Sequence, residues 1–534
     1  MPAQRLYLYD TTLRDGAQTR GVDFSVKDKA TIAGWLDKLG IAYIEGGWPG
    51  ANPTDDAFFA SPPALKTAKL TAFGMTRKPG NAADNDPGLQ ALLNSPATAV
   101  CLVGKCWDVH VTGALGVTLD ENLDLIRSSL SHIVSRKKEA LFDAEHFFDG
   151  FKANAPYALS CLKAAQEAGA KWLVLCDTNG GTLPHEVEAI VREVIAALPN
   201  ANFGIHVHND TGNAIANSLA GARAGCRMIQ GTINGLGERC GNADLIALIP
   251  TLTQKLGFDV GIKGEKLKGL TALSRAFDAL LDRDPVSSAP YVGASAFAHK
   301  GGLHASAVAK NPRFYEHADP NSVGNQREIL MSNQAGQSNV RAQLQALDID
   351  VADNDPRLPA LLASVKQREH EGYSYDNAAG SFAVLALRAL GRLPVYFTLQ
   401  DFSVHDAGRF DANGQLLLET KASLSLRVGD DTVTRVAIGN GPVNALDRAL
   451  REALINYYPA LANVKLTDYH VRILDTGAAT GAKTRVLLES EDEVSKTSWT
   501  TTGVSTDIIG ASLQALLDSY ILQLSRLTNG RPHA

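Results

Sequence analysis

Short apolar runs alternate with amphipathic stretches from residue 5 to about residue 260. Residues 5–10 and 41–46 are rich in apolar and aromatic side chains, which predicts strands. Between them, residues 25–40 follow helical spacing, with Ser25 as the N-cap and Gly40 just past the last turn. Further strands are expected at residues 70–75, 99–103, 140–144, 172–176, 203–207 and 228–233, with helices such as 153–168 and 185–198 between them.

This alternation predicts the fold class. It makes eight strand–helix units over about 255 residues, which is the size and rhythm of an α/β fold of the (β/α)8 TIM-barrel type. An open, doubly wound sheet is the alternative, but no G-x-G-x-x-G run opens a helix in this half of the chain. We therefore expect residues 1–262 to form a barrel domain that carries the chemistry.

The pattern changes twice beyond the predicted barrel. Residues 263–393 are helical and irregular, which predicts a linker subdomain. Its helices are expected at residues 266–283, 357–370 and 377–390, with a Gly-rich separating stretch around residues 298–305. Residues 394–534 contain a βββα pattern twice, which predicts an α+β domain. The two units comprise strands 396–403, 416–427 and 432–438 with helix 443–457, and strands 465–474, 484–489 and 496–502 with helix 507–524. Ligand sensing or dimerisation fits this domain better than catalysis.

Composition narrows the function classes. The chain has 534 residues and a net charge of −6, which gives no reason to expect nucleic acid or a membrane as a partner. No stretch approaches the ~20 apolar residues of a membrane helix, and the first ten residues lack a signal-peptide pattern. We expect a cytoplasmic protein. The six cysteines contain no C-x-x-C pair, so all six, Cys240 included, are expected to serve packing.

Chemically capable side chains follow the ends of several predicted strands. Arg14 and Asp15 follow the first strand, Glu145 the fifth and Thr178 the sixth. His206 and His208 close the seventh strand, and the run from Asn234 to Asn242 follows the eighth. Functional residues of a barrel lie at the carboxyl ends of its strands. We therefore expect these side chains to converge.

His206 and His208 are two residues apart on a strand, so their side chains point to the same face. Two imidazoles and the carboxylate of Asp15 would leave coordination positions open for water and substrate. These mixed nitrogen and oxygen ligands predict a divalent metal site. They are compatible with Zn²⁺, Mn²⁺, Co²⁺ or Mg²⁺, and the sequence does not choose among these ions.

Several motifs together resemble the DRE-TIM metallolyases, specifically their acyl-CoA-condensing synthases, such as 2-isopropylmalate and citramalate synthases. In the barrel, the motifs are DTTLRDGAQTR (10–20), HVHND (206–210) and GLGERCGN (235–242). Later matches are FAHKGGLHA (297–305), GNGPVN (439–444) and GVSTDII (503–509). The resemblance covers essentially the whole chain and implies a LeuA-type allosteric and dimerisation domain at its end. The run IEGGWPGANP (44–53) is closest to the citramalate-forming branch.

The resemblance implies a condensation of acetyl-CoA with a 2-oxo acid, followed by thioester hydrolysis. Asp15, His206 and His208 would hold the metal, with Asn242 as a further ligand or near neighbour. The metal would polarise the ketone of the 2-oxo acid. Arg14 would stabilise the developing alkoxide, and Thr178 would bind the substrate carboxylate.

The linker supplies further candidates by the same resemblance. His304, assisted by Glu145, matches the family's candidate base, and Tyr315 matches an active-site tyrosine. The family's architecture implies a homodimer in which this linker completes the partner's active site. A branched-chain amino acid is the expected effector of the terminal domain.

The substrate is the least determined part of the prediction. Pyruvate, giving (R)-citramalate for isoleucine biosynthesis, is the first hypothesis. The alternatives are 2-oxoisovalerate (2-isopropylmalate), 2-oxoglutarate (homocitrate) or a retro-aldol lyase on the same barrel. A few wall residues decide such a choice. Asp143, two residues before Glu145, and Gln18 are the candidates that we place at the substrate. Asp143 departs from the tyrosine or serine that relatives carry there.

Overall fold

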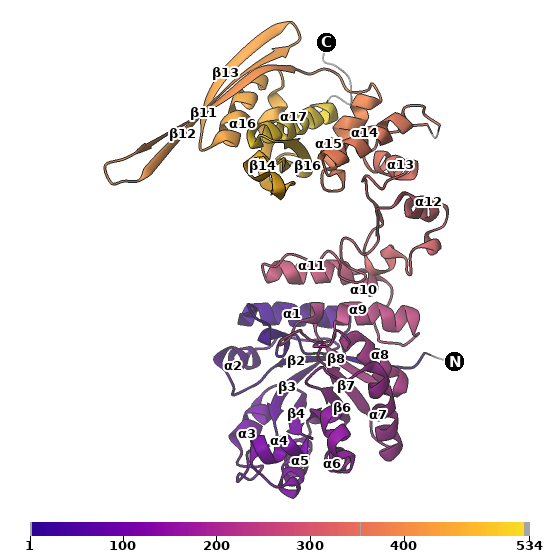
Figure 1. The fold of residues 1–534 in the computed structure, drawn as a ribbon. Coiled ribbons are helices and arrows are strands. Elements are labelled where there is room, and N and C mark those ends of the chain that lie inside the picture. Colours follow the sequence, from indigo (N-terminus) through magenta and orange to yellow (C-terminus); the bar gives the residue numbers. More distant parts are fainter. Residues whose placement is uncertain (1–2, 353, 528–534) are drawn as a thin grey trace. The chain divides into compact units, whose positions relative to one another are not determined.

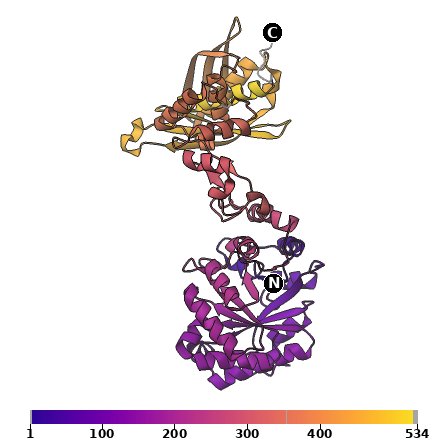
Figure 2. The same ribbon diagram turned by 90° about the vertical axis from the view of Figure 1, so that its right-hand side faces the viewer.

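The computed structural model describes residues 3–352 and 354–527. Its first part is a closed barrel of eight parallel strands in sequence order, with β1 paired to both β2 and β8. Figure 1 shows these strands surrounded by helices, and Figure 2 shows the same barrel after a quarter turn. The strands are β1 (Tyr7–Asp10), β2 (Tyr43–Gly47), β3 (Lys69–Met75), β4 (Ala99–Lys105), β5 (Glu139–Glu145), β6 (Trp172–Asp177), β7 (Phe203–Val207) and β8 (Met228–Gly231). The predicted fold class is confirmed.

Helices follow the strands and cover the outside of the barrel. In the first of them, the Ser25 hydroxyl accepts from the Asp28 amide and the Asp28 carboxylate accepts in return from the Ser25 amide. Gly40 ends this helix at φ 109°, a left-handed conformation that favours glycine. The helices are α1 (Val26–Leu39), α2 (Pro53–Ala60), α3 (Pro87–Asn94), α4 (Asp108–His110), α5 (Leu119–Ser135), α6 (Phe147–Glu167), α7 (Pro184–Ala197), α8 (Ala214–Ala224) and α9 (Leu245–Pro250).

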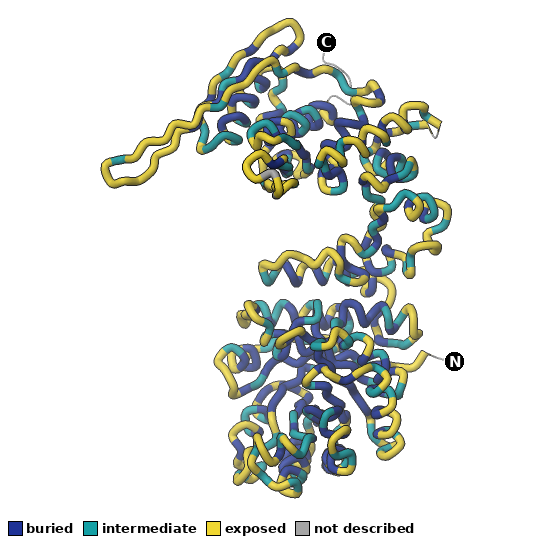
Figure 3. The backbone as a smooth tube through the Cα atoms, viewed as in Figure 1, coloured by how far each residue is buried: buried dark blue, intermediate teal, exposed yellow. Residues whose placement is uncertain are grey.

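The barrel strands are buried on both faces, as Figure 3 shows by their dark blue colour. Their outward side chains pack against the helices in one large apolar cluster. A second cluster fills the inside of the barrel and includes Tyr9, Tyr43, Phe73 and Trp172. This packed interior leaves polar side chains at the carboxyl ends of the strands as the place for chemistry.

The segment after the barrel departs from the prediction in two places. The helix expected at residues 266–283 is divided into α10 (Glu265–Lys268) and α11 (Leu270–Leu280). The Gly-rich stretch at residues 298–305 is not simply a separating loop, because α12 (Gly302–Lys310) begins inside it after the short strand β9 (Ala298–His299). The remaining elements up to residue 389 are β10 (Glu328–Ile329), α13 (Gln337–Ala346), α14 (Leu358–Glu371) and α15 (Ala379–Ala389).

The terminal part confirms the βββα repeat. Two three-stranded antiparallel sheets have the orders β11-β12-β13 and β14-β15-β16, and each is followed by one long helix. The first set is β11 (Thr398–Phe410), β12 (Leu416–Val428), β13 (Asp431–Gly439) and α16 (Pro442–Leu454); the second is β14 (Val464–Ile473), β15 (Thr484–Asp492), β16 (Thr497–Ser505) and α17 (Ile508–Leu527). Both helices pack on their sheets around one apolar cluster.

The chain forms two compact units. One contains residues 1–297 and 318–326, and the other contains residues 298–317 and 327–534. The three-domain division at residues 262 and 393 stays a prediction beside this two-unit division. Among the described residues, the helices are all too short or too polar to cross a membrane.

Candidate active site at the carboxyl ends of the barrel strands

Arg14 and Asp15 lie in a tight turn directly after β1. The amide groups of both residues donate to the carbonyl oxygen of Thr11, at 3.2 and 2.9 Å. Asp10, the last residue of β1, stabilises the turn, because its carboxylate accepts hydrogen bonds from the amide and the hydroxyl of Thr12. The Thr12 hydroxyl in turn accepts from the amide of Ile233, which follows β8. Through Thr12, the turn is therefore hydrogen-bonded both to the end of β1 and to the segment after β8.

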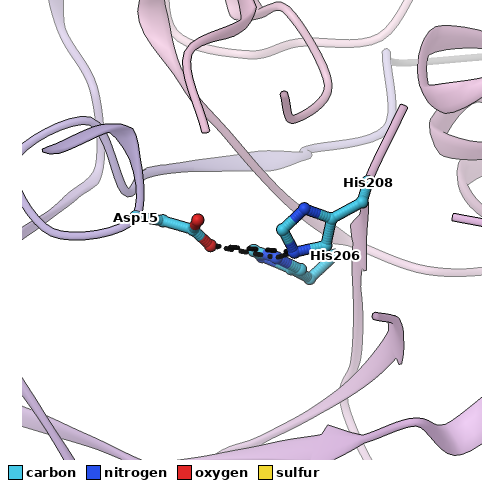
Figure 4. A group of neighbouring side chains, drawn as sticks. All are labelled: Asp15, His206 and His208. Atoms are coloured by element: carbon cyan, nitrogen blue, oxygen red, sulfur yellow. Dashed lines mark hydrogen bonds and ion pairs between the residues drawn. The ribbon is translucent and has the colours of Figure 1, made fainter. Parts of the chain in front are cut away.

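His206 of β7 and His208, directly after this strand, meet Asp15 as the sequence predicted (Figure 4). His206 Nε2 and His208 Nε2 are 3.3 Å apart. Asp15 Oδ2 lies 3.4 Å from the His206 nitrogen and 3.9 Å from the His208 nitrogen. All three residues are buried, with 3–6% of their surface exposed.

These donors fit a divalent metal ion. One ligand atom from each residue lies within 4.8 Å of the others. Atoms bound at ~2.1 Å to a common ion lie roughly 3.0–3.4 Å apart when the bond angles are between 90° and tetrahedral, close to the separations seen here. Asp15 Oδ1 and Asn242 Oδ1 are buried and have no hydrogen-bond partner among the described residues, which is unusual for such atoms.

Asn242 is placed beside the histidines by the backbone. It forms an isolated antiparallel bridge with His208, and its Nδ2 donates to the Leu236 carbonyl at 3.2 Å. That hydrogen bond orients the Asn242 side-chain amide so that its Oδ1 remains available as a metal ligand. Gly237 makes room for this amide, since a Cβ at Gly237 would lie 2.2 Å from Asn242 Nδ2.

The charges at this site suit metal binding. Burial raises the pKa of Asp15, but Arg14, His206 and His208 lower it by more, so the net pKa is well below the usual range. Burial lowers the pKa of His208 to about 4, and the neighbouring His206 contributes to this lowering. At neutral pH, Asp15 is thus ionised and His208 neutral, the forms that coordinate a metal. Burial lowers the pKa of His206, but Asp15 raises it by more, so metal binding there releases a proton.

Arg14 is held by Glu45, a residue that the sequence reasoning missed. Arg14 Nε donates to Glu45 Oε1 at 2.6 Å, and the Tyr9 hydroxyl donates to Glu45 Oε2 at 2.5 Å. The guanidinium lies 3.8 Å from the centre of the Phe73 ring. The available signal was a glutamate inside an otherwise apolar strand, because such a charge is rarely buried without a partner.

The remaining barrel candidates surround the same cavity, which has a volume of about 250 Å³. Glu145 at the end of β5 forms an ion pair with Lys105 of β4. The Thr178 hydroxyl oxygen accepts from the His146 amide at 2.9 Å, so its own hydrogen is free to be donated. The sequence-predicted residues that line this cavity are Arg14, Asp15, Gln18, Asp143, Glu145, Thr178, His206 and His208.

His304 and Tyr315 belong to the other compact unit and are described within it. Their rings stack with centres 4.2 Å apart. Glu316, next to Tyr315, accepts from Arg327 and lies 3.3 Å from His299 Nε2. These interactions anchor the tyrosine segment to β9 and to the residue before β10.

Cys240 corrects the expectation that all six cysteines serve packing. Five of them are buried, but Cys240 is exposed. It lies in a turn between Arg239 and Gly241, both with positive φ, and Arg239 pairs with Asp210 at 2.7 Å. This turn directs the cysteine to the surface.

Comparisons with known proteins agree with this site. A family model described as HMGL-like matches residues 5–273. A model for a homocitrate synthase post-HMGL domain matches residues 291–372, and one for the LeuA allosteric (dimerisation) domain matches residues 376–522.

Curated relatives match over nearly the full chain. The (R)-citramalate synthase of Aquifex aeolicus is 48% identical, covering 98% of both chains. The enzyme of the same name from Synechocystis is 47% identical, covering 98% of this chain and 97% of the relative. A probable 2-isopropylmalate synthase of Methanopyrus kandleri is 29% identical, covering 99% of both. The chain therefore belongs to the HMGL-like family and, within it, to the (R)-citramalate synthases.

Proposed function

We propose that the protein is an acyltransferase that condenses acetyl-CoA with pyruvate and hydrolyses the product to (R)-citramalate and CoA. The observation that carries this proposal is the buried Asp15–His206–His208 group beside Arg14 in one small cavity. The citramalate synthases at 43–48% identity support pyruvate as the 2-oxo acid. The product would enter isoleucine biosynthesis, and a cytoplasmic location stays a prediction.

The metal-binding residues are Asp15, His206 and His208, with Asn242 beside them. A bound divalent cation, of which Mn²⁺, Mg²⁺, Zn²⁺ and Co²⁺ are candidates, would act as a Lewis acid on the ketone of the 2-oxo acid. Arg14 presents a guanidinium fixed by Glu45 to the same cavity, where it stabilises the negative charge that develops on the ketone oxygen. Thr178 directs its free hydroxyl hydrogen to the substrate carboxylate.

The proton transfer is assigned to His304 with Glu145. His304 removes a proton from the acetyl methyl group, since an imidazole exchanges protons near neutral pH. Tyr315 stacks on the His304 ring, and by the family resemblance we assign it to the active site with His304. We place these two residues in the active site of the partner subunit of a homodimer. Support comes from the match to the LeuA dimerisation domain and from Tyr315, 42% of which is exposed.

The cavity wall sets the size of the 2-oxo acid. Phe73, Met75 and Val103 supply apolar surface, while Asp143 and Gln18 supply polar surface. The cavity of about 250 Å³ is of a size that takes a small 2-oxo acid. Discrimination of about 10-fold or more per added methylene is expected from such a wall.

The terminal domain is proposed to sense a branched-chain amino acid and to dimerise. Its family match supports both roles. Exposed apolar side chains on the β11–β12 hairpin, among them Phe410, Leu416 and Leu418, offer a surface for a second copy of the chain.

The test is the rate of CoA release from acetyl-CoA with pyruvate, 2-oxoisovalerate and 2-oxoglutarate, each across a concentration series with Mn²⁺ present. We expect kcat/KM for pyruvate to exceed the other two by about tenfold or more, with citramalate as the product. A higher kcat/KM for 2-oxoisovalerate would replace this assignment with 2-isopropylmalate synthesis. CoA release with none of the three acids would reject the condensation.

A further inference from the structure

Gln230 on β8 is a fully buried amide that uses both of its ends. Its Nε2 donates to Asp143 Oδ1 at 2.9 Å. Its Oε1 lies 2.9 Å from His206 Nδ1. The three side chains are 0–5% exposed, so bulk water does not replace either partner. They form a continuous hydrogen-bonded chain from β5 through β8 to β7.

The direction of this chain follows from the chemistry of its first member. Burial raises the pKa of Asp143, while the neighbouring His206 acts against this rise. In its ionised form the carboxyl group has only acceptors, so the NH₂ group of Gln230, which donates to Oδ1, faces Asp143. The Gln230 carbonyl then faces His206 and can only accept, which requires the His206 Nδ1 to carry a hydrogen. In the neutral ring, His206 Nε2 then keeps its lone pair on the side of Asp15 and His208. A ring nitrogen must be in this form to coordinate a metal. Burial lowers the pKa of His206 but Asp15 raises it by more, so a metal that binds Nε2 must displace the proton that Asp15 favours there.

The hydrogen bond between Asp143 and Gln230 spans the inside of the barrel. Asp143 belongs to a strand that is not a neighbour of β8 in the barrel, so the contact crosses the barrel interior. Side chains from separate strands fill such an interior in layers. In this buried layer, a reversed amide would place the Gln230 carbonyl against the Asp143 carboxylate and its NH₂ group against an Nδ1–H, two repulsive contacts in a medium of low polarity.

We propose that Asp143 is a positioning residue for the metal centre: through Gln230 it fixes the tautomer and ring orientation of His206. This inference rests on the metal site of the proposed function and goes beyond the role of Asp143 as a cavity wall. Removal of a partner that orients a metal-binding histidine typically weakens metal affinity by about 10- to 100-fold.

The test measures Mn²⁺ affinity of the full-length protein from the electron paramagnetic resonance signal of free Mn²⁺. Asp143→Asn keeps the shape of the side chain but adds a donor, so the amide of Gln230 loses its fixed direction. We expect its Kd for Mn²⁺ to rise by about 10- to 100-fold. Thr71→Val is the matched control, because Thr71 is buried on β3 and its hydroxyl has no hydrogen-bond partner among the described residues. It should bind Mn²⁺ like the parent.

A second variant separates the effect of the hydrogen-bond direction at residue 230 from a general disruption of the site. In Asp143→Asn combined with Gln230→Glu, the carboxylate introduced on β8 accepts both from the amide introduced on β5 and from His206 Nδ1, so the direction is restored. We expect this double variant to recover Mn²⁺ affinity to within about threefold of the parent. Gln230→Met, which is similar in size, removes both hydrogen bonds and should weaken binding even if Asp143→Asn does not fold. Nitrogen-15 resonances of the His206 ring should show the hydrogen on Nδ1 in the parent and in the double variant.

The outcomes are distinguishable. Mn²⁺ binding by Asp143→Asn or Gln230→Met within about twofold of the parent would overturn the inference, since loss of an orienting partner should cost about tenfold or more. A weakened single variant that the double variant does not recover would also overturn it, because direction would then not be the cause. A parent protein that binds no Mn²⁺ or other candidate metal would instead reject the metal site of the proposed function.

Discussion

Individual residue types identified the metal group but not its surroundings. Asp15, His206 and His208 were predictable because strand ends in a barrel converge and two histidines at alternate positions share a face. Glu45 and Gln230 were not, because each is a single polar residue in an apolar strand and its partners lie on strands distant in sequence. Only the closed barrel brings Glu45 to Arg14 and Gln230 to His206.

Gly237 provides a test of the loop that places Asn242. In Gly237→Ala, the new methyl carbon would lie 2.2 Å from Asn242 Nδ2, so the amide must move. We expect the Kd for Mn²⁺ to rise by about tenfold or more.

Gly212→Ala is the matched control for this glycine. Gly212 also has a positive φ (72°), but its added carbon would meet no atom within 4 Å. It should cost roughly 1–2 kcal/mol of stability and leave Mn²⁺ affinity unchanged. Equal Mn²⁺ affinities of the parent and Gly237→Ala would argue against a role for this loop in the metal site.

At the scale of elements, apolar periodicity located the barrel strands to within a few residues, but the strand expected to end at residue 403 continues to Phe410. The βββα repeat was also predictable, because three strand-like segments precede each helix, whereas a barrel unit has one strand before each helix. The start of α12 was not, because Gly301 and Gly302 favour a loop and the helix depends on tertiary contacts: the Gly302 amide donates to the Gln334 carbonyl, and α12 packs against α13. Local propensity therefore misplaced the element that carries His304.

The contact between α15 and α17 predicts a pH dependence of stability. Asp518 accepts from the Ser381 hydroxyl at 2.7 Å, and burial raises its pKa to about 6. An unfolded aspartate has a pKa of ~3.9, so between these values the folded form retains a proton that the unfolded form releases. The contribution of Asp518 therefore falls as pH rises from about 4 to about 6 and is constant above that range.

Asp518→Asn should remove this dependence. Between about pH 4.5 and about pH 7.5, we expect its free energy of unfolding to gain about 2 kcal/mol relative to the parent. Urea unfolding at the two pH values measures this, with Asp401→Asn on the exposed part of β11 as the control. Parallel changes in the parent and Asp518→Asn would show that the carboxyl group does not retain its proton in the folded protein.

At the scale of the whole molecule, the second unit carries both the segment with His304 and Tyr315 and the domain that matches the LeuA dimerisation model. The distal part of the β11–β12 hairpin, residues 405–419, extends beyond the helices of its own unit and is almost entirely exposed (Figures 1 and 3). Exposed apolar side chains gathered in this way mark an interaction surface. The sequence predicted a dimerisation domain by resemblance, but it did not show that these side chains are exposed within the described part of their own unit.

The hairpin predicts the effect of a charge on assembly. Leu418 is 68% exposed, and Leu418→Glu would have to bury a charge if this surface pairs with a second copy. We expect light scattering during size-exclusion chromatography to show a dimer for the parent and a monomer for the variant. Val286→Glu, at a site 61% exposed in the barrel unit, should remain a dimer. A Leu418→Glu variant that stays dimeric would place the interface elsewhere.

The central claim is a metal-dependent condensation at the Asp15–His206–His208 group. The most direct measurement is CoA release from acetyl-CoA and pyruvate by protein stripped with a chelator, before and after addition of Mn²⁺, Mg²⁺, Zn²⁺ or Co²⁺. The account predicts a loss of rate of about 100-fold or more on stripping and recovery with one or more of these ions, because polarisation of the ketone contributes several kcal/mol to the transition state. An unchanged rate in fully metal-free protein would contradict it.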